Sequence, residues 1–217
     1  EWTGTKHGAA SKAELLMGLT DLICLFFTTR LLAWVPEGST PRPEEHSLLV
    51  AARGGIGKSE RAVVNAARVS VQRALARLAS HATCEKGLRL SKSEEGKSQH
   101  SPGAAACSLG ASSGWVLPLD GRGGARRYLA PGALQLKSLV RALVSPGRSL
   151  TWEEFHGRAW EHFQLCLGGV HCTRFSRRRV SEAVIRTAGA LNQERLLRLD
   201  LARREADNVV VVDGGMR

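Results

Sequence analysis

Apolar residues occur along this chain in short runs separated by longer amphipathic segments. Three such runs cover residues 46–51 (HSLLVA), 115–119 (WVLPL) and 209–212 (VVVV), and a glycine follows each within three residues. Short apolar runs that contain β-branched residues and end in a turn are typical of strands buried in a parallel sheet. We therefore expect three strands at these places, although Pro118 fits poorly in a central strand because it cannot donate a ladder hydrogen bond.

The segments between these runs predict helices. Residues 59–81 are rich in Ala, Val, Leu and Arg and contain neither Gly nor Pro, with a break expected near Ser70. Three more helices are predicted over residues 131–144, 151–167 and 176–199, and Thr151 and Glu154 have the spacing of a capping box. Strands alternating with helices predict an α/β fold, with a parallel sheet and flanking helices.

The first part of the chain has a different pattern. Residues 15–35 are almost continuously apolar and about as long as a membrane span, but Asp21 and Arg30 interrupt them at positions where a charge is costly in a bilayer. We expect a helix buried against the protein or facing a partner, and a membrane is the less favoured environment. Prolines and glycine at residues 36–43 then form a linker.

Two domains of unequal size follow from this pattern. Residues 1–45 form an N-terminal helical segment with its linker, and residues 46–217 form the main α/β domain. Within the second, residues 92–114 are rich in Ser, Gly, Lys and Ala, which predicts a flexible loop.

Charge and cysteine content add constraints. Lys and Arg total 31 against 20 Asp and Glu, a net charge of +11, which favours polyanionic partners. Many arginines fall late in the chain. The five cysteines form no Cys-x-x-Cys pair and the chain has no secretory signal pattern, so we expect reduced thiols and a cytoplasmic location.

The most informative motif is Arg53-Gly54-Gly55-Ile56-Gly57-Lys58-Ser59, between a predicted strand and a predicted helix. Backbone N–H groups can converge on a phosphate where bulky Cβ atoms are absent, and the following helix begins with the positive end of its dipole. In that arrangement Lys58 would neutralise phosphate charge and Ser59 would give its hydroxyl to Mg²⁺.

The glycine pair resembles the deviant loop of the ParA/MinD family of P-loop ATPases, and residues 50–67 (VAARGGIGKSERAVVNAA) look like that family's first strand, loop and helix. The resemblance implies a P-loop NTPase-like fold that binds ATP and Mg²⁺ and acts in DNA partitioning or positioning. It places Arg53, Gly54, Gly55, Ile56, Gly57, Lys58, Ser59 and Glu60 around the nucleotide. It also implies nonspecific DNA binding through the late arginines, and a homodimer in which Arg53 reaches a phosphate across the interface.

Two later segments fall in the family's order. LDGRGGA at residues 119–125 looks like the segment whose aspartate orients the attacking water, which gives Asp120 a catalytic role beside Lys58. DNVVVVDGG at residues 207–215 looks like the Walker B strand, which would make Asp213 a metal ligand together with Ser59.

Several departures from the family weigh against hydrolysis. Arg53 stands where the family has lysine, Glu60 puts an acid near the phosphates, and Pro118 replaces an aspartate. The chain also stops just after the third predicted strand. A degenerate or truncated member would match this pattern.

A non-enzymatic alternative is a mostly α protein with tandem winged helices that binds DNA as a transcription or chromosome-organisation factor. Residues 66–90 and 176–201 each look like a recognition helix followed by the first strand of a wing. Arg73, Arg77 and the arginines at 177–179 would then meet phosphates or bases. This alternative gives no role to the glycine loop.

Overall fold

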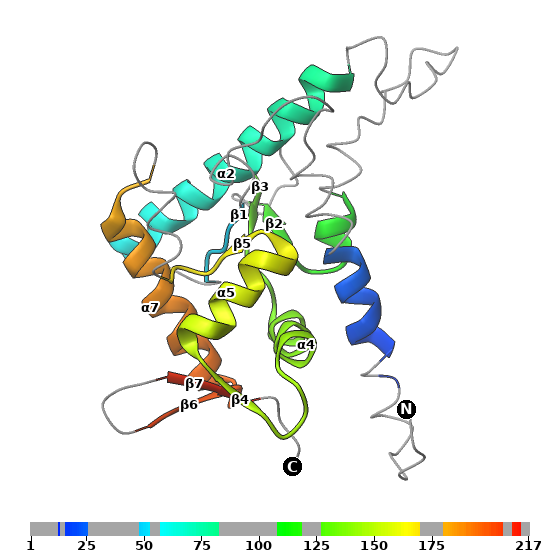
Figure 1. The fold of residues 1–217 in the computed structure, drawn as a ribbon. Helices are drawn as coiled ribbons and strands as arrows, with labels where there is room; N and C mark the ends of the chain where they lie inside the picture. The colour runs from blue at the N-terminus through cyan, green and yellow to red at the C-terminus, as the bar shows by residue number, and fades with distance from the viewer. Residues whose placement is uncertain are drawn as a thin grey trace.

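The computed structural model describes residues 13, 16–25, 48–52, 57–82, 108–118, 127–169, 180–205 and 210–213. In these residues the fold is mixed α/β, mostly helical, with small sheets (Figure 1). The main helices are α2 (Lys58–Ala82), α4 (Ala133–Leu143), α5 (Trp152–Phe163) and α7 (Glu182–Arg198). The strands are β1 (Leu48–Leu49), β2 (Val116–Pro118), β3 (Arg127–Leu129), β4 (Ser149–Thr151), β5 (Leu165–Cys166), β6 (Ala202–Arg204) and β7 (Val210–Asp213).

Strand β1 lies at the centre of the molecule, between two neighbours. It pairs in parallel with β5, and Val50 forms a parallel bridge to Leu129 at the end of β3. On the far side, β3 pairs antiparallel with β2. The hydrogen bonds continue past β1, because the N–H of Val50 donates to the carbonyl of Cys166 and that of Ala51 to the carbonyl of Leu129, both at 2.9 Å.

Burial on both faces explains why the segment around β1 is continuously apolar. Leu48 and Val50 join the larger hydrophobic cluster with α4 and α5, whereas Leu49 and Ala51 join a second cluster with α2 and α7. Successive side chains of a strand point to opposite faces, so a strand covered on both sides needs apolar residues at every position. The strand predicted at residues 46–51 is confirmed over residues 48–50.

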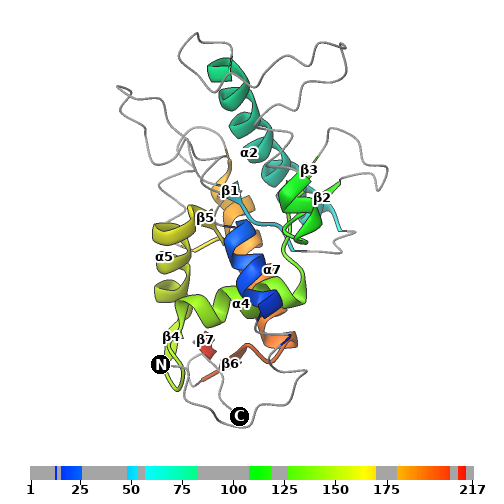
Figure 2. The same ribbon diagram turned by 90° about the vertical axis from the view of Figure 1, so that its right-hand side faces the viewer.

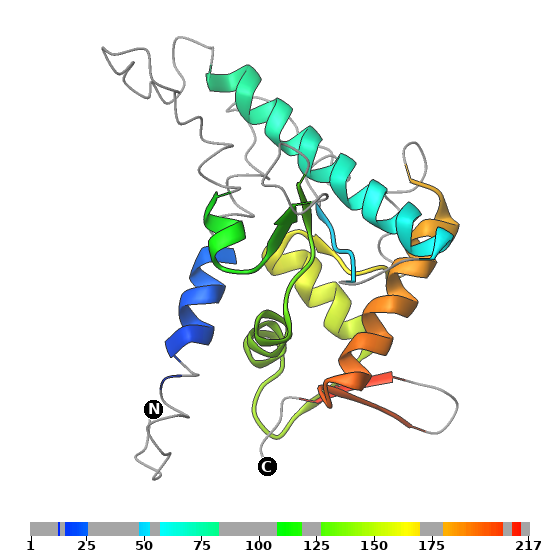
Figure 3. The same cartoon turned by 180° about the vertical axis from the view of Figure 1, so that it is seen from behind.

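The remaining strands form a separate antiparallel sheet in the order β4-β7-β6, at the end of α7 away from α2 (Figures 1 and 3). The valine strand predicted near the C-terminus therefore exists, but it does not lie beside β1. The Trp115 strand also exists, as the antiparallel partner of β3. The expectation of one parallel sheet containing all three strands is wrong for the described residues, where β1 and β5 are the only strands paired in parallel.

The local signals for the helices are confirmed at some positions and wrong at others. The helix predicted over residues 151–167 ends at Phe163, because Leu165–Cys166 form strand β5. Thr151 Oγ1 accepts from the N–H of Glu154, and the Glu154 carboxylate accepts from the N–H of Thr151 at 2.8 Å, so the capping box of α5 is confirmed. The break predicted near Ser70 is wrong, because α2 runs through it. The Ser70 hydroxyl donates to the carbonyl of Ala67 at 2.7 Å and accepts from the N–H of Leu49 at 3.2 Å, so it helps join α2 to β1.

The N-terminal helix over residues 16–25, blue in Figure 2, packs against the protein. The indole N–H of Trp115 donates to the carbonyl of Asp21 at 2.9 Å, and the amide of Gln135 donates to its carboxylate at 3.0 Å. This agrees with a helix that packs on the main domain. Residues 26–47 lie outside the described part, and no helix within that part is long and apolar enough to cross a membrane.

Two expectations need correction. Residues 108–112 are helical and Ser113 Oγ donates to the carbonyl of Leu109 at 2.8 Å, so the end of the segment predicted as a flexible loop has regular structure.

Cys166, on buried strand β5, is disulfide-bonded, whereas reduced thiols were expected; Cys24 is free. Cysteine spacing alone does not reveal a pairing that depends on how the chain folds.

Candidate functional site

The described part of the glycine-loop motif lies at the start of α2, the helix that follows β1 in the chain. Gly57, Lys58 and Ser59 are exposed at the start of the helix, while Arg53, Gly54, Gly55 and Ile56 lie outside the described residues. The N–H of Gly57 donates to Glu60 Oε2 at 2.8 Å. The N-terminus of α2 therefore already holds an anion, the carboxylate of its own first turn.

The expected partners of this loop are not gathered around it in the described structure. Asp213 ends β7 and pairs with Ser149 in the antiparallel sheet, so its strand is not a neighbour of β1. Asp120 lies outside the described residues. Among the residues that are described, no three His, Cys, Asp or Glu side chains form a group that could hold a metal ion. Ser59 thus lies in the first turn of α2, after β1, whereas Asp213 ends a strand of a different sheet, so the two do not meet at one sheet edge.

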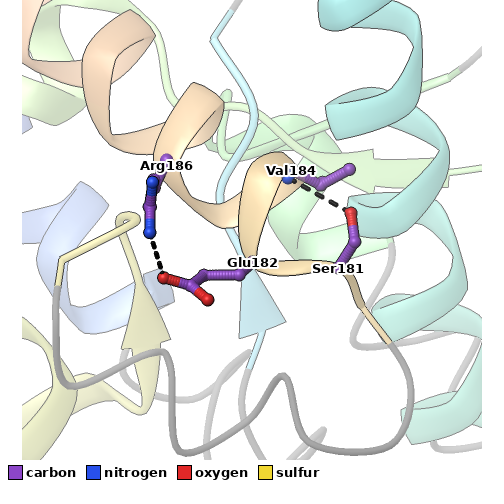
Figure 4. Close-up of polar contacts among 4 residues, drawn as sticks. All are labelled: Ser181, Glu182, Val184 and Arg186. Carbon is purple, nitrogen blue, oxygen red and sulfur yellow. Dashed lines mark hydrogen bonds and ion pairs between the residues drawn. The ribbon is translucent and has the colours of Figure 1, made fainter.

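Helix α7 is the second notable element. Ser181 caps it by accepting from the N–H of Val184, and Glu182 forms an ion pair with Arg186 one turn later (Figure 4). Glu182, Arg186 and Ala190 are all exposed, and their spacing of four residues puts them on one face of the helix. The opposite face, with Ile185, Ala188, Asn192 and Leu196, is buried. One face of α7 is therefore exposed in the part of the chain that the structure describes.

A two-stranded hairpin, β6 with β7, follows the C-terminal end of α7. Arg203 and Arg204 are exposed on β6, and Arg203 pairs with Glu205 at 3.0 Å. Arg204 reaches back to Glu194 on α7, at 3.5 Å. The hairpin is thus joined to the helix by charge as well as by chain connectivity.

Asn192 fixes the position of α7. It is 3% exposed, and its Nδ2 group donates to the carbonyl of Val50 at 3.1 Å and to that of Leu167 at 3.0 Å. These carbonyls follow β1 and β5, so one side chain ties the helix to the carboxyl ends of both parallel strands. Asn192 was not among the residues predicted from the sequence. Its signal was a single amide in the apolar stripe formed by Ile185, Ala188 and Leu196.

Next to this junction, a cavity of about 320 Å³ lies between α2 and α7, just past the end of β1. Ala51, Val63, Val64 and Leu191 contribute apolar surface. Glu60 contributes a carboxylate from α2, and Glu194, Arg195 and Arg198 contribute charges from α7. No local pattern pointed to this cavity, because its two walls lie far apart in the sequence.

Comparison with protein families, with curated protein sequences and with solved structures finds no match to this chain.

Proposed function

We propose that the C-terminal half of this chain is a winged-helix-like DNA-binding module, with α7 as its recognition helix. The observation that carries the proposal is topological. Helix α4, strand β4, helices α5 and α7 and the hairpin β6-β7 occur in the order of a winged helix, and the sheet order β4-β7-β6 places the first strand against the last. Strand β5, between α5 and α7, is an addition to this order and pairs with β1. This favours the non-enzymatic alternative, in a form with one such module rather than two.

A shared core supports treating these elements as one unit. Leu139 of α4, Phe155 of α5, Leu196 of α7 and Val212 of β7 all belong to one buried hydrophobic cluster. Helices that pack in this way on a small sheet can present a third helix to a major groove. By contrast, α2, which contains the first of the two predicted recognition helices, packs on β1, β3 and α7.

Charge supports a nucleic-acid partner. Residues 133–213 contain thirteen Lys and Arg against nine Asp and Glu, and the arginines at 177–179 precede α7 by two residues in the sequence. Arg186 is engaged with Glu182, but both side chains are more than half exposed. Because exposed ion pairs contribute only about 0–1 kcal/mol, Arg186 can exchange its carboxylate for a phosphate at little cost.

The test is binding of the full chain to duplex DNA, measured by fluorescence anisotropy at several salt concentrations. Affinity should fall steeply with salt, and Arg186→Gln should weaken binding and reduce the salt slope by about 1 for the lost phosphate contact. Arg141→Gln, an exposed arginine on α4, is the matched control and should change neither. Salt-independent binding, or equal losses in both variants, would refute the proposed role of α7.

Nucleotide binding at residues 53–60 is a second candidate, supported by the position of that loop between β1 and α2. In α/β proteins ligands commonly bind beyond the carboxyl ends of parallel strands, and β1 has a parallel neighbour in β5. Mg-ATP should raise the melting temperature, and Lys58→Ala should abolish the rise. Arg61→Ala, an exposed cation nearly one turn further along α2, should leave the rise intact. An unchanged melting temperature in the parent protein would eliminate this candidate.

A further inference from the structure

The cavity between α2 and α7 combines an apolar interior with separated charges of both signs. Val63 and Val64 on α2 face it together with Leu191 on α7. Its volume of about 320 Å³ lies at the lower end of the range of ligand pockets, roughly 300–1,000 Å³. A cavity of this size suits a molecule of about ten heavy atoms better than a nucleoside triphosphate.

Two of the charged groups on its walls, Glu60 and Arg198, are only partly engaged. Glu60 Oε2 accepts from Gly57, and its other oxygen, Oε1, has no hydrogen-bond partner in the part of the chain that the structure describes. Arg198 uses Nε toward Glu194 at 3.1 Å, and its two terminal amino groups have no partner among the described residues. One wall therefore offers a hydrogen-bond acceptor and the other wall offers donors.

The balance of charge selects the kind of ligand. The four charged side chains of the lining are two glutamates and two arginines, Glu60, Glu194, Arg195 and Arg198. Glu194 is already paired with Arg198 and Arg204. A polyanion would still meet the carboxylate of Glu60, and a simple cation would meet the guanidinium of Arg198, each with an unfavourable energy in a partly enclosed site. A molecule with one positive and one negative group matches both walls without adding net charge.

We propose that this cavity binds a free amino acid with an apolar side chain, or a zwitterion of the same chemistry. Glu60 accepts from the ammonium group, Arg198 donates to the carboxylate, and Val63, Val64 and Leu191 surround the side chain. The ligand contacts α2 and α7 at once and thereby holds α7 in place. Its effect on DNA affinity rests on the proposed function of α7, but binding itself does not.

Calorimetric titration of the full chain with L-leucine, L-methionine and L-phenylalanine tests the site. We expect at least one of them to bind with a Kd in the micromolar to low millimolar range. For L-leucine, matched probes are 4-methylpentanoate, which lacks the ammonium group, and 3-methylbutylamine, which lacks the carboxylate. Each should bind at least tenfold more weakly, because charge-assisted hydrogen bonds are the strong ones. Absence of binding by all three amino acids, or equal binding of the one-charge probes, would overturn the proposal.

Two arginines on α7 provide a matched pair of variants. Arg198 and Arg186 have side chains that are both 76% exposed, and each pairs with a glutamate four residues earlier. Arg198→Gln should weaken amino-acid binding at least tenfold, whereas Arg186→Gln should leave it unchanged. Glu60→Gln, which keeps an acceptor for Gly57, should also weaken it at least tenfold. Equal effects of the two arginine variants would show that the ligand does not occupy this cavity.

DNA affinity measured with and without the amino acid then tests the coupling separately. A ligand that binds but leaves the affinity for duplex unchanged would sustain the site and overturn its regulatory effect. A chain that binds no duplex at all would refute the proposed function while the calorimetric result still decides the ligand site.

Discussion

Replacing Asn192 with leucine tests how much one buried amide contributes to this fold. The variant keeps nearly the same shape but removes the only donor that the structure places against the carbonyls of Val50 and Leu167 in its described part. Val50 and Leu167 are 1% and 2% exposed, so water cannot easily replace the hydrogen bonds that their carbonyls lose. A buried group left without its hydrogen bond costs about 1–3 kcal/mol, which gives about 2–6 kcal/mol for two carbonyls. The apolar leucine offsets part of this cost, so we expect a loss of about 2–4 kcal/mol in the free energy of unfolding.

The assay is equilibrium unfolding of the full chain in urea, with the slope of the transition compared between variants so that a change in cooperativity is recognised. Asn65→Leu is the control, because Asn65 is exposed on α2 and such substitutions usually stay within about 0.5 kcal/mol. Asn192→Asp tests the direction in which stability changes with pH. Its carboxylate would face two carbonyl oxygens in a buried site, so its folded-state pKa should be raised and the variant should gain stability relative to wild type as pH falls. If Asn192→Leu is no more destabilising than Asn65→Leu, the amide does not tie α7 to the strands.

Other consequences can be measured on the same chain. Gly168 and Gly147 both have positive φ (102° and 71°), but a Cβ at Gly168 would lie 2.1 Å from the backbone nitrogen of Gly189, whereas at Gly147 nothing lies within 4 Å. Gly147→Ala should therefore lower the free energy of unfolding by about 1–2 kcal/mol from backbone strain alone. Gly168→Ala should lower it several times more, because its Cβ would also meet the backbone of α7. Similar urea midpoints for the two variants would contradict the close packing of α7 on the end of β5. The backbone and side-chain hydrogen bonds from Thr151 lower the pKa of Glu154 from its ordinary value of 4.5. A carboxylate whose pKa is lower in the folded state stabilises the fold above its unfolded-state pKa, and this stability is lost as pH falls through its folded-state pKa. The melting temperature should therefore drop on acidification below about pH 4.5, and it should drop less steeply in Glu154→Gln. Identical pH profiles would show that the capping box does not contribute. At Asp21, burial raises the pKa of the carboxyl group, and the hydrogen bond from Gln135 opposes this shift only in part. Asp21→Asn should therefore gain stability relative to wild type as pH rises through the folded-state pKa of Asp21, measured by the same melts. A stability difference that stays constant across that range would indicate that the carboxylate is not desolvated.

The sequence by itself determined features that depend on near neighbours in the chain. The capping box of α5 needs only Thr151 and Glu154, three residues apart, and it forms as predicted. The apolar run ending at Ala51 required a strand buried on both faces, whatever covered it. The four valines near the C-terminus required a strand for the same kind of local reason.

Only the tertiary structure decided which of these elements meet. Strand β7 pairs antiparallel with β4 and β6, although its apolar run resembles that of a parallel strand, because the run reports burial and not the identity of the neighbours. Asn192 faces two carbonyls 142 and 25 residues away. Glu60 and Arg198 share a cavity only because α2 packs on α7. Such pairings are selected by the joint packing of the whole core. The hydrophobic periodicity of a single segment contains no information about which other segment will pack against it.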